Sequence, residues 1–343
     1  MENSSTITSK PIIQLLKKIA IPASTGSIFQ TLFNIVDTFF AGKISSDALA
    51  ALAKSFPLYF IIISAGIGIV AGCNSLISNS LGQRNRFAAL IYSHHTFIYS
   101  ILLSIIITTF GILFSYDILK LMGSSSESII LAKKYTDIIF YGTVFFLILT
   151  SLNAILYSQG DTKTYRNVLI VGLFANILLN PIFIFGFLFI PAFGIAGLAI
   201  STILIQFFAC VYLYYKVNQT ILKINFKTES FLIRKNFFLN IFNQCMPITF
   251  ALFLVALGSY LILSFISVFG DEAVAGYGAA VRFEHIFTLP VIGLNTAVIT
   301  IAGQNFGARR YNRVRETYKK ATLIGFLIMC LSGLIIFLLS EFI

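Results

Sequence analysis

Nine long apolar stretches recur along the chain, separated by short segments rich in charged residues, Gly or Pro. Each stretch is long enough, at about 1.5 Å per helical residue, to cross about 30 Å of hydrocarbon. The pattern therefore predicts an all-α polytopic membrane protein. Its predicted transmembrane helices cover residues 14–41, 48–81, 88–115, 132–158, 166–189, 194–216, 238–269, 273–306 and 318–341.

The composition supports a membrane protein. Of the 343 residues, 57% are hydrophobic and 11% are charged, whereas soluble domains contain about 25% charged residues. The net charge of +11 does not indicate a nucleic-acid partner, because the basic residues lie between the apolar stretches. Eighteen Lys and Arg fall on the side of the N-terminus and four on the other, with Lys54 and Arg282 inside predicted helices. This bias predicts a cytoplasmic N-terminus and, after nine spans, a C-terminus outside.

Neither a cleaved leader nor a cysteine framework is expected. Lys10, Lys17 and Lys18 precede an apolar stretch over 19–41, which is too long for a signal peptide, so we expect it to remain as a membrane helix. The cysteines lie far apart, without CxxC spacing or a His partner, and predict neither a disulfide nor a zinc site. They are Cys73, Cys210, Cys245 and Cys330.

An internal repeat appears when the chain is compared with itself at an offset of 225 residues. The matched positions include a Pro in the first helix of each copy, an acid between the first two helices, and a Gly-x-Arg after the second. They are Pro22 with Pro247, Asp47 with Glu272, Ala48 with Ala273, Ala50 with Ala275, Gly68 with Gly293, Gly82 with Gly307 and Arg84 with Arg309. Because one period holds six helices, both copies should have the same orientation in the membrane.

The repeat also predicts the domain organisation. We expect a six-helix N-terminal lobe over residues 1–220, a cytoplasmic linker over 221–237 and a C-terminal lobe over 238–343. Two full periods would need about 450 residues. Ile343 pairs with Ile118 of the first copy, so we expect an incomplete second lobe of three helices.

The loops contain no segment typical of an enzyme. The longest polar segment, over 216–236, is too short for a nucleotide-binding domain, and the GxxxxGK[ST] motif is absent. The glycines of 66–71 resemble a dinucleotide fingerprint but lie inside an apolar helix, where they favour helix packing. We expect no enzymatic activity and no cofactor, so an ion gradient would have to supply the energy for uphill transport.

Polar residues within the first helix indicate a functional site. Ser27, Gln30, Asn34 and Asp37 recur at spacings of three and four, which predicts one polar stripe. Hydrogen bonding between helices explains Ser27 and Asn34 as well as a functional role does. A carboxylate at membrane depth is unfavourable unless it is paired or faces water, so Asp37 favours a cation or proton site. Its repeat mate is Ile262.

The fifth predicted helix carries a second polar pair. Asn176 and Asn180 lie one turn apart and precede Pro181, whose ring frees the carbonyl of residue 177 from helix bonding. Amide oxygens beside a freed carbonyl could hold Na⁺ or relay a proton. Helix packing is the alternative explanation for this pair.

In the eighth predicted helix, Arg282 and Glu284 lie two residues apart and point in different directions. They could form ion pairs that lock the bundle, or a substrate or proton site. The sequence leaves both possibilities open.

Several motifs resemble those of the bacterial multidrug and toxic compound extrusion (MATE) transporters, and the resemblance covers the whole chain. They are the segments NIVDTFFAG at 34–42, QGDTKT at 159–164, NILLNPIFIFG at 176–186, GIAGLA at 194–199 and GQNFGA at 303–308. The resemblance implies twelve helices in two lobes, a central cleft and cation-coupled export of diverse, often cationic compounds.

The resemblance also assigns roles to residues. It implies that Asp37 binds the coupling ion, H⁺ or Na⁺. The polar neighbours it implies are Gln30, Tyr135, Asn153, Asn176 and Thr202. Many family members have Asp where this chain has Asn180, which weakens the Na⁺ interpretation relative to H⁺. The absence of the last three helices is a second departure from the family.

These observations together predict a cation-coupled antiporter in the bacterial cytoplasmic membrane. The coupling-ion set is Asp37, Asn176, Asn180 and Thr202, with Na⁺ possible at the first three; the polar-cleft set is Gln30, Asn34, Tyr135, Asn153, Arg282 and Glu284. We expect a monomer surrounded by lipid that takes a cationic or amphipathic small molecule. The alternatives are a lipid-linked oligosaccharide flippase, which should have a cleft rich in Arg and Lys, and an inactive fragment.

Overall fold

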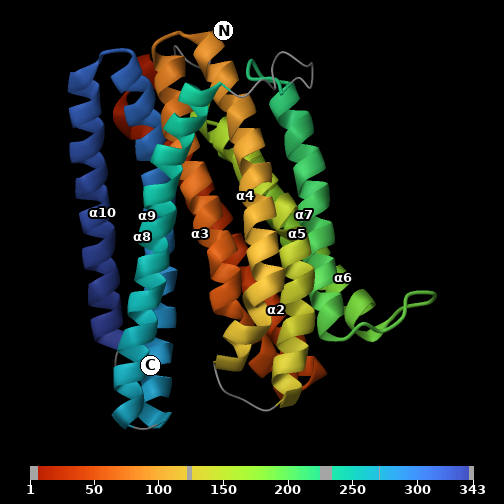
Figure 1. Ribbon diagram of the computed structural model, residues 1–343. Coiled ribbons are helices and arrows are strands. Elements are labelled where there is room, and N and C mark those ends of the chain that lie inside the picture. The colour runs from red at the N-terminus through yellow and green to blue at the C-terminus, as the bar shows by residue number, and fades with distance from the viewer. Residues whose placement is uncertain (1–6, 122–125, 225–233, 270, 340–343) are drawn as a thin grey trace.

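The computed structural model describes residues 7–121, 126–224, 234–269 and 271–339, and within 260–283 several side chains fall outside the description. Long helices account for nearly all of it (Figure 1). They are α2 (Ile12–Ile44), α3 (Ser46–Gly82), α4 (Arg86–Leu121), α5 (Ser126–Ser158), α6 (Lys163–Phe185), α7 (Ile195–Asn218), α8 (Lys235–Ile266), α9 (Asp271–Gly307) and α10 (Tyr311–Leu339). A 3₁₀ turn over Ser267–Phe269 joins α8 to α9.

The fold class predicted from the apolar pattern is confirmed. Within the described ranges, nine helices are long and apolar enough to cross a membrane. Most helices extend beyond the predicted ends, because an apolar stretch marks the hydrocarbon-spanning part and not the polar turns that continue it. The largest difference is at α10, which begins at Tyr311 and not at residue 318, since the polar segment up to Lys320 is already helical.

The helices form two packed groups. Within the first group, α2–α7, helix α5 packs against α3, α4 and α7, and α6 packs against α2 and α7. Within the second group, α8–α10, helix α10 packs against α9. The groups meet where α8 and α9 pack against α3 and where α9 packs against α2.

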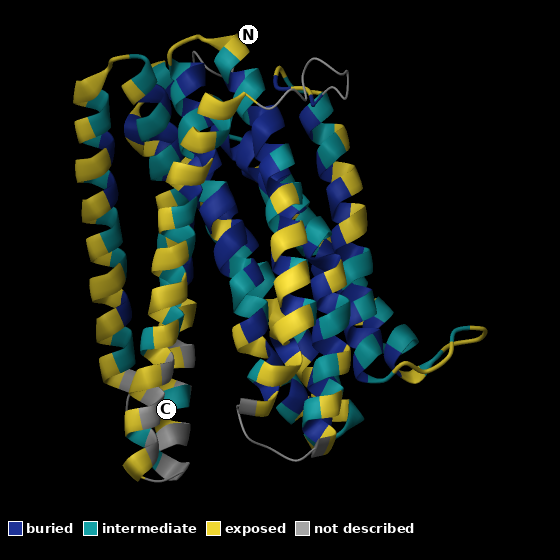
Figure 2. Ribbon diagram, viewed as in Figure 1, coloured by how far each residue is buried: buried dark blue, intermediate teal, exposed yellow. Residues whose placement is uncertain are grey.

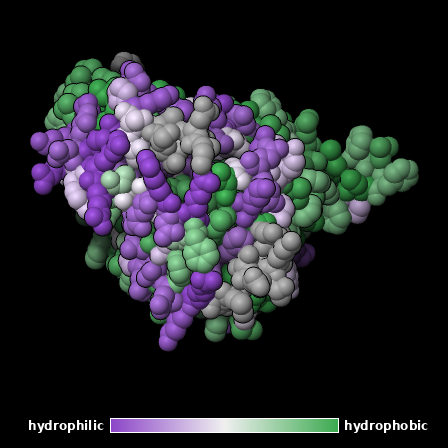
Figure 3. All heavy atoms as spheres, turned by 90° about the horizontal axis from the view of Figure 1, so that it is seen from above, coloured by the Kyte–Doolittle hydropathy of each residue, from purple (hydrophilic) through white to green (hydrophobic). Residues whose placement is uncertain are grey.

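The two groups are in contact mainly at the end of the bundle that carries the N-terminus, and they lie further apart at the opposite end (Figure 1). On α8, Ile241 and Cys245 are buried, whereas Val255 and Phe265 are exposed. The second half of α9 is likewise more buried than the part around Ile286 (Figure 2). Viewed from the N-terminal end, the surface is largely hydrophilic (Figure 3).

The internal repeat is visible in the backbone. Arg84 and Arg309, 225 residues apart, both adopt the left-handed region, with φ of 58° and 56°. Gly82 ends α3 and Gly307 ends α9, and in each case the second residue after that Gly has the positive φ. The helix-closing hydrogen bonds also match, since the amide of Asn85 donates to the Ser80 carbonyl at 3.0 Å and that of Arg310 to the Asn305 carbonyl at 2.8 Å.

Candidate functional site

The candidate site is a buried polar cluster centred on Asp37 of α2. Asp37 is 7% exposed, and Asn176 and Asn180 of α6 are fully buried. The Nδ2 atoms of Asn176 and Asn180 donate to Oδ1 of Asp37 at 2.8 and 3.0 Å. The 3.6-residue helical repeat places Asn176 and Asn180 on one face of α6. The sequence-predicted trio is therefore brought together in space.

Helix α7 supplies the next set of contacts. The hydroxyl of Ser201 donates to Oδ1 of Asn180, and Nδ2 of Asn180 also donates to Oδ1 of Asn176 at 3.2 Å. The Thr202 side chain interacts with the Asp37 carboxylate. Because Ser201 occupies the amide oxygen of Asn180, the amide nitrogen is directed toward the carboxylate.

Two tyrosines lie in the wider surroundings of the carboxylate. Tyr135 of α5 is buried, Tyr59 of α3 is half-buried, and both lie close enough to interact electrostatically with Asp37. Tyr135 was expected near the site, whereas Tyr59 was not. The amides of Asn176 and Asn180 and the Thr202 side chain hydrogen-bond to Asp37, and all three are neutral.

No Lys or Arg in the described part of the chain forms an ion pair with Asp37. Within the described residues, the ion pairs are Lys133 with Asp137 at 2.6 Å and Lys320 with Glu316 at 2.5 Å. Asp37 therefore forms a buried carboxylate without an ion-pair partner in that part of the chain. Such a charge is unfavourable in hydrocarbon-like surroundings unless a proton or cation neutralises it.

Gln30 lines a separate small cavity within the α2–α7 group. This cavity of about 20 Å³ could hold one water molecule. Gln206 of α7 is the other polar side chain around it. The lining residues are Gln30, Phe33, Leu149, Val168, Leu169, Gly172, Ile205, Gln206 and Ala209.

The remaining predicted residues do not join the Asp37 cluster. Asn153 is buried, and its Oδ1 has no hydrogen-bond partner within the described chain. Asn34 and Glu284 are exposed. Arg282 belongs to α9, but its side chain lies outside the described residues. The single polar stripe expected on α2 is therefore divided, since Asn34 does not share the burial of Asp37.

Helical geometry explains the division. At 100° per residue, Gln30 lies about 20° from the direction of Asp37, whereas Asn34 lies about 60° away.

Sequence reasoning missed Ser201, Tyr59 and Gln206. Ser201 and Gln206 interrupt the apolar helix over 194–216, which is the signal that could have identified them.

A second polar network joins the two helix groups. Nδ2 of Asn74 in α3 donates to the Thr300 hydroxyl of α9 at 3.0 Å, and that hydroxyl lies 3.0 Å from the Tyr157 carbonyl of α5. Nε2 of Gln304 donates to the Ser158 carbonyl at 2.7 Å. All of these side chains are buried, so the network fixes how α9 packs against α3 and α5.

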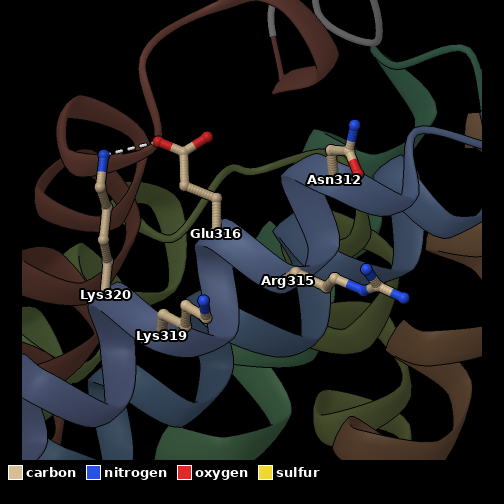
Figure 4. Close-up of a pocket in the computed structure, with 5 residues that line it drawn as sticks. All are labelled: Asn312, Arg315, Glu316, Lys319 and Lys320. Atoms are coloured by element: carbon tan, nitrogen blue, oxygen red, sulfur yellow. Dashed lines mark hydrogen bonds and ion pairs between the residues drawn. The ribbon is translucent and has the colours of Figure 1, made fainter.

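A shallow concave surface lies elsewhere, on the first turns of α10. It encloses about 310 Å³ and contains none of the predicted site residues. Figure 4 shows the Glu316–Lys320 ion pair at one side and Arg315 directed away from it. Its lining residues are Asn312, Arg315, Glu316, Lys319 and Lys320.

The fold and the buried carboxylate cluster define a multi-pass helical membrane protein. The MatE family model matches this chain twice, over residues 22–182 and 247–343, and therefore covers more than half of it. The chain belongs to the MatE family. The two matches begin at Pro22 and Pro247, which are separated by the 225 residues of the internal repeat.

Individual relatives agree with this family membership. The probable multidrug resistance protein YoeA of Bacillus subtilis is 28% identical over 341 residues, spanning 97% of this chain and 73% of YoeA. The probable multidrug resistance protein NorM of Thermotoga maritima is 27% identical, spanning 95% of this chain and 70% of NorM.

A solved structure shows the same fold. It is described as an outward-facing conformation of a multidrug resistance MATE family transporter of the MOP superfamily. Its TM-score is 0.90 at 22% identity, over 99% of this chain and 76% of that one. The family resemblance and the fold inferred from the sequence are thus confirmed.

Proposed function

We propose that this protein is a cation-coupled antiporter that exports organic cations or amphipathic compounds by alternating access. The observation that carries the proposal is the buried Asp37 carboxylate, contacted by the neutral amides of Asn176 and Asn180. Binding a proton or cation there removes an uncompensated charge. A change of that kind shifts the balance between two helix arrangements if they bind the ion with different affinities.

The hydrogen-bond pattern favours H⁺ over Na⁺ as the coupling ion. Both amide donors use Oδ1 of Asp37, so protonation of Oδ2 leaves those two hydrogen bonds in place. Na⁺ requires several oxygen ligands. The amide oxygens of Asn176 and Asn180 already accept from Asn180 and Ser201, so they would have to reorient to bind Na⁺.

The arrangement of the helix groups supports an outward-open state. The turns after α3 and α9 carry basic residues such as Arg84 and Arg309, and they lie at the end where the two groups are in contact, since Gly82 adjoins Gln304 and Gly307 adjoins Asn79. The positive-inside bias assigns that end to the cytoplasm. The separation at the other end would then admit exchange with the exterior. A bacterial cytoplasmic membrane and a monomeric state belong to the same proposal.

The substrate class follows from charge. A binding region that contains an uncompensated carboxylate favours cationic over anionic compounds. A lipid-linked oligosaccharide flippase would need basic side chains for pyrophosphate. Lys54, one of two basic residues within predicted helices, instead donates to the Ser128 hydroxyl at 2.8 Å.

Transport by purified protein in liposomes tests the proposal. A fluorescent organic cation is placed on one side, and either a pH gradient or a Na⁺ gradient is imposed. Movement of the dye driven by the pH gradient supports the proposal as stated, and movement driven by Na⁺ alone corrects the coupling ion. Translocation of a lipid-linked oligosaccharide without dye transport would favour the flippase, and no transport of either would contradict both transport functions.

A further inference from the structure

Two cysteines that are remote in sequence meet where the helix groups join. Sγ of Cys73 in α3 lies 3.7 Å from Sγ of Cys245 in α8, and both residues are fully buried. The other cysteines are elsewhere, since Cys210 donates to the Phe145 carbonyl and Cys330 is exposed. All four are free thiols. The sequence spacing gave no indication of this proximity.

Small residues on α3 explain the close approach. A Cβ added at Gly72 would lie 2.7 Å from Sγ of Cys245 and 3.0 Å from its backbone nitrogen. At Gly68, one turn earlier, a Cβ would lie 2.9 Å from the Cys245 carbonyl oxygen. These glycines allow the α8 backbone to approach α3 directly. A disulfide needs a sulfur separation of about 2.05 Å, so the two sulfurs must close by about 1.7 Å.

We infer that Cys73 and Cys245 form a disulfide when an uncharged two-electron oxidant reaches them, and that this bond locks the two helix groups together. A diazene such as diamide is a suitable oxidant. The sulfur of one cysteine adds to the N=N bond, and the sulfur of the other then attacks the first, breaking the S–N bond. The two thiols lose two protons and two electrons, and the diazene gains them to become a hydrazine. A dithiol reductant reverses the bond.

The position of the pair makes the bond sensitive to conformation. Cys245 is buried against α3, whereas Phe250 and Leu254, further along the same helix, are 59% and 49% exposed. The contact is therefore confined to one half of α8. If the groups separate at this end during alternating access, the sulfurs move apart, and the disulfide prevents that movement. This effect on transport rests on the proposed function, whereas formation of the bond does not.

The reduced state is the resting state of the pair. Both cysteines are fully buried, and burial in an apolar contact lowers thiol reactivity and keeps charged oxidants away from the sulfurs. Transport would therefore continue under ordinary conditions. An oxidant that enters the membrane phase would arrest the protein until a reductant restores both thiols.

A cleavable version of the chain tests the inference directly. A protease site is inserted after Lys223, between α7 and α8, and Cys210→Ser and Cys330→Ser remove the other thiols. Membranes are treated with diamide, cleaved and analysed by gel electrophoresis. We expect one full-length band without reductant and two fragments with it. The matched variants Cys73→Ser and Cys245→Ser should give two fragments under both conditions.

Two fragments from the oxidised protein without reductant would overturn the inference, provided that both thiols react with maleimide after denaturation. A band larger than one chain would also overturn it, because the bond would then join two copies. If the cross-linked protein transports as fast as the protein with both thiols reduced, the locking role alone is overturned. The gel result stands whether or not the protein proves to be an antiporter, so failure of the two proposals can be distinguished.

Discussion

The side-chain amide of Asn176 donates to Oδ1 of Asp37 at 2.8 Å, across the contact between α6 and α2. Residues 139 positions apart thus form one buried polar unit, which Asn180 and Ser201 extend. The amide is neutral, so it orients the carboxylate without compensating its charge. The unit can therefore respond to a proton or cation, whereas an ion pair such as Lys133–Asp137 already has its charge balanced.

Replacing Asn180 by Asp should change which ion the site accepts. Asn180→Asp places a second carboxylate beside Asp37, and two adjacent carboxylates favour a shared proton or a bound cation. We expect Na⁺ to stimulate transport by this variant more than transport by the wild type. Dye efflux measured over a series of Na⁺ concentrations at fixed pH checks this.

Asn167→Asp is the matched control, because Asn167 is exposed on the same helix and gains the same charge outside the cluster. Equal Na⁺ responses of both variants would mean that the added charge acts through the surface and not through the Asp37 site.

Ser201→Ala should weaken transport while leaving the protein folded. The Ser201 hydroxyl orients the Asn180 amide, and loss of one buried hydrogen bond costs about 1–3 kcal/mol. Transport should fall by about tenfold if about 1.4 kcal/mol of that loss affects the coupled step. Initial efflux rates, normalised to protein in the membrane, provide the measurement.

Ser27→Ala is the control for this effect, because the Ser27 hydroxyl donates to the Ala23 carbonyl of its own helix. An equal decrease for both variants would contradict a specific role of Ser201.

Gly82→Ala and Gly307→Ala should both disturb the contact between α3 and α9. A Cβ at Gly82 would collide with the Gln304 carbonyl, and one at Gly307 would collide with the Asn79 carbonyl. Overpacking of this kind typically costs about 1–3 kcal/mol. Both variants should lower the thermal stability of the purified protein and the yield of the Cys73–Cys245 cross-link.

Gly42→Ala should change neither property, since a Cβ at Gly42 would meet no atom of the described residues beyond its own helical turn within 4 Å. Unchanged stability and cross-linking in both the Gly82 and Gly307 variants would show that the two helices do not pack this closely in the membrane.

Much of the fold could be predicted because hydrophobic length and the repeat are properties of the sequence itself. The apolar stretches identified the helices, and the Gly82–Gly307 and Arg84–Arg309 pairs identified equivalent turns. The start of α10 was misplaced, because a polar segment gives no apolar signal even when it is helical.

The candidate site was predictable where a residue was unusual for its surroundings. Asp37 and the Asn176–Asn180 pair stood out within apolar helices, and the structure places them in contact. Ser201 did not stand out, since a serine is common in membrane helices. The Cys73–Cys245 proximity depends on how two helices cross, which residue spacing along a single chain does not specify.

The most direct test of the central claim is proton movement coupled to export by the Asp37→Asn variant. The protein is reconstituted in liposomes that contain a pH-sensitive dye, and a pulse of an organic cation is added. Wild-type protein and the control Asp137→Asn, which removes a carboxylate paired with Lys133, should give a substrate-dependent pH change. Asp37→Asn should give none while still inserting in the membrane. A wild-type pH change from Asp37→Asn would contradict the account.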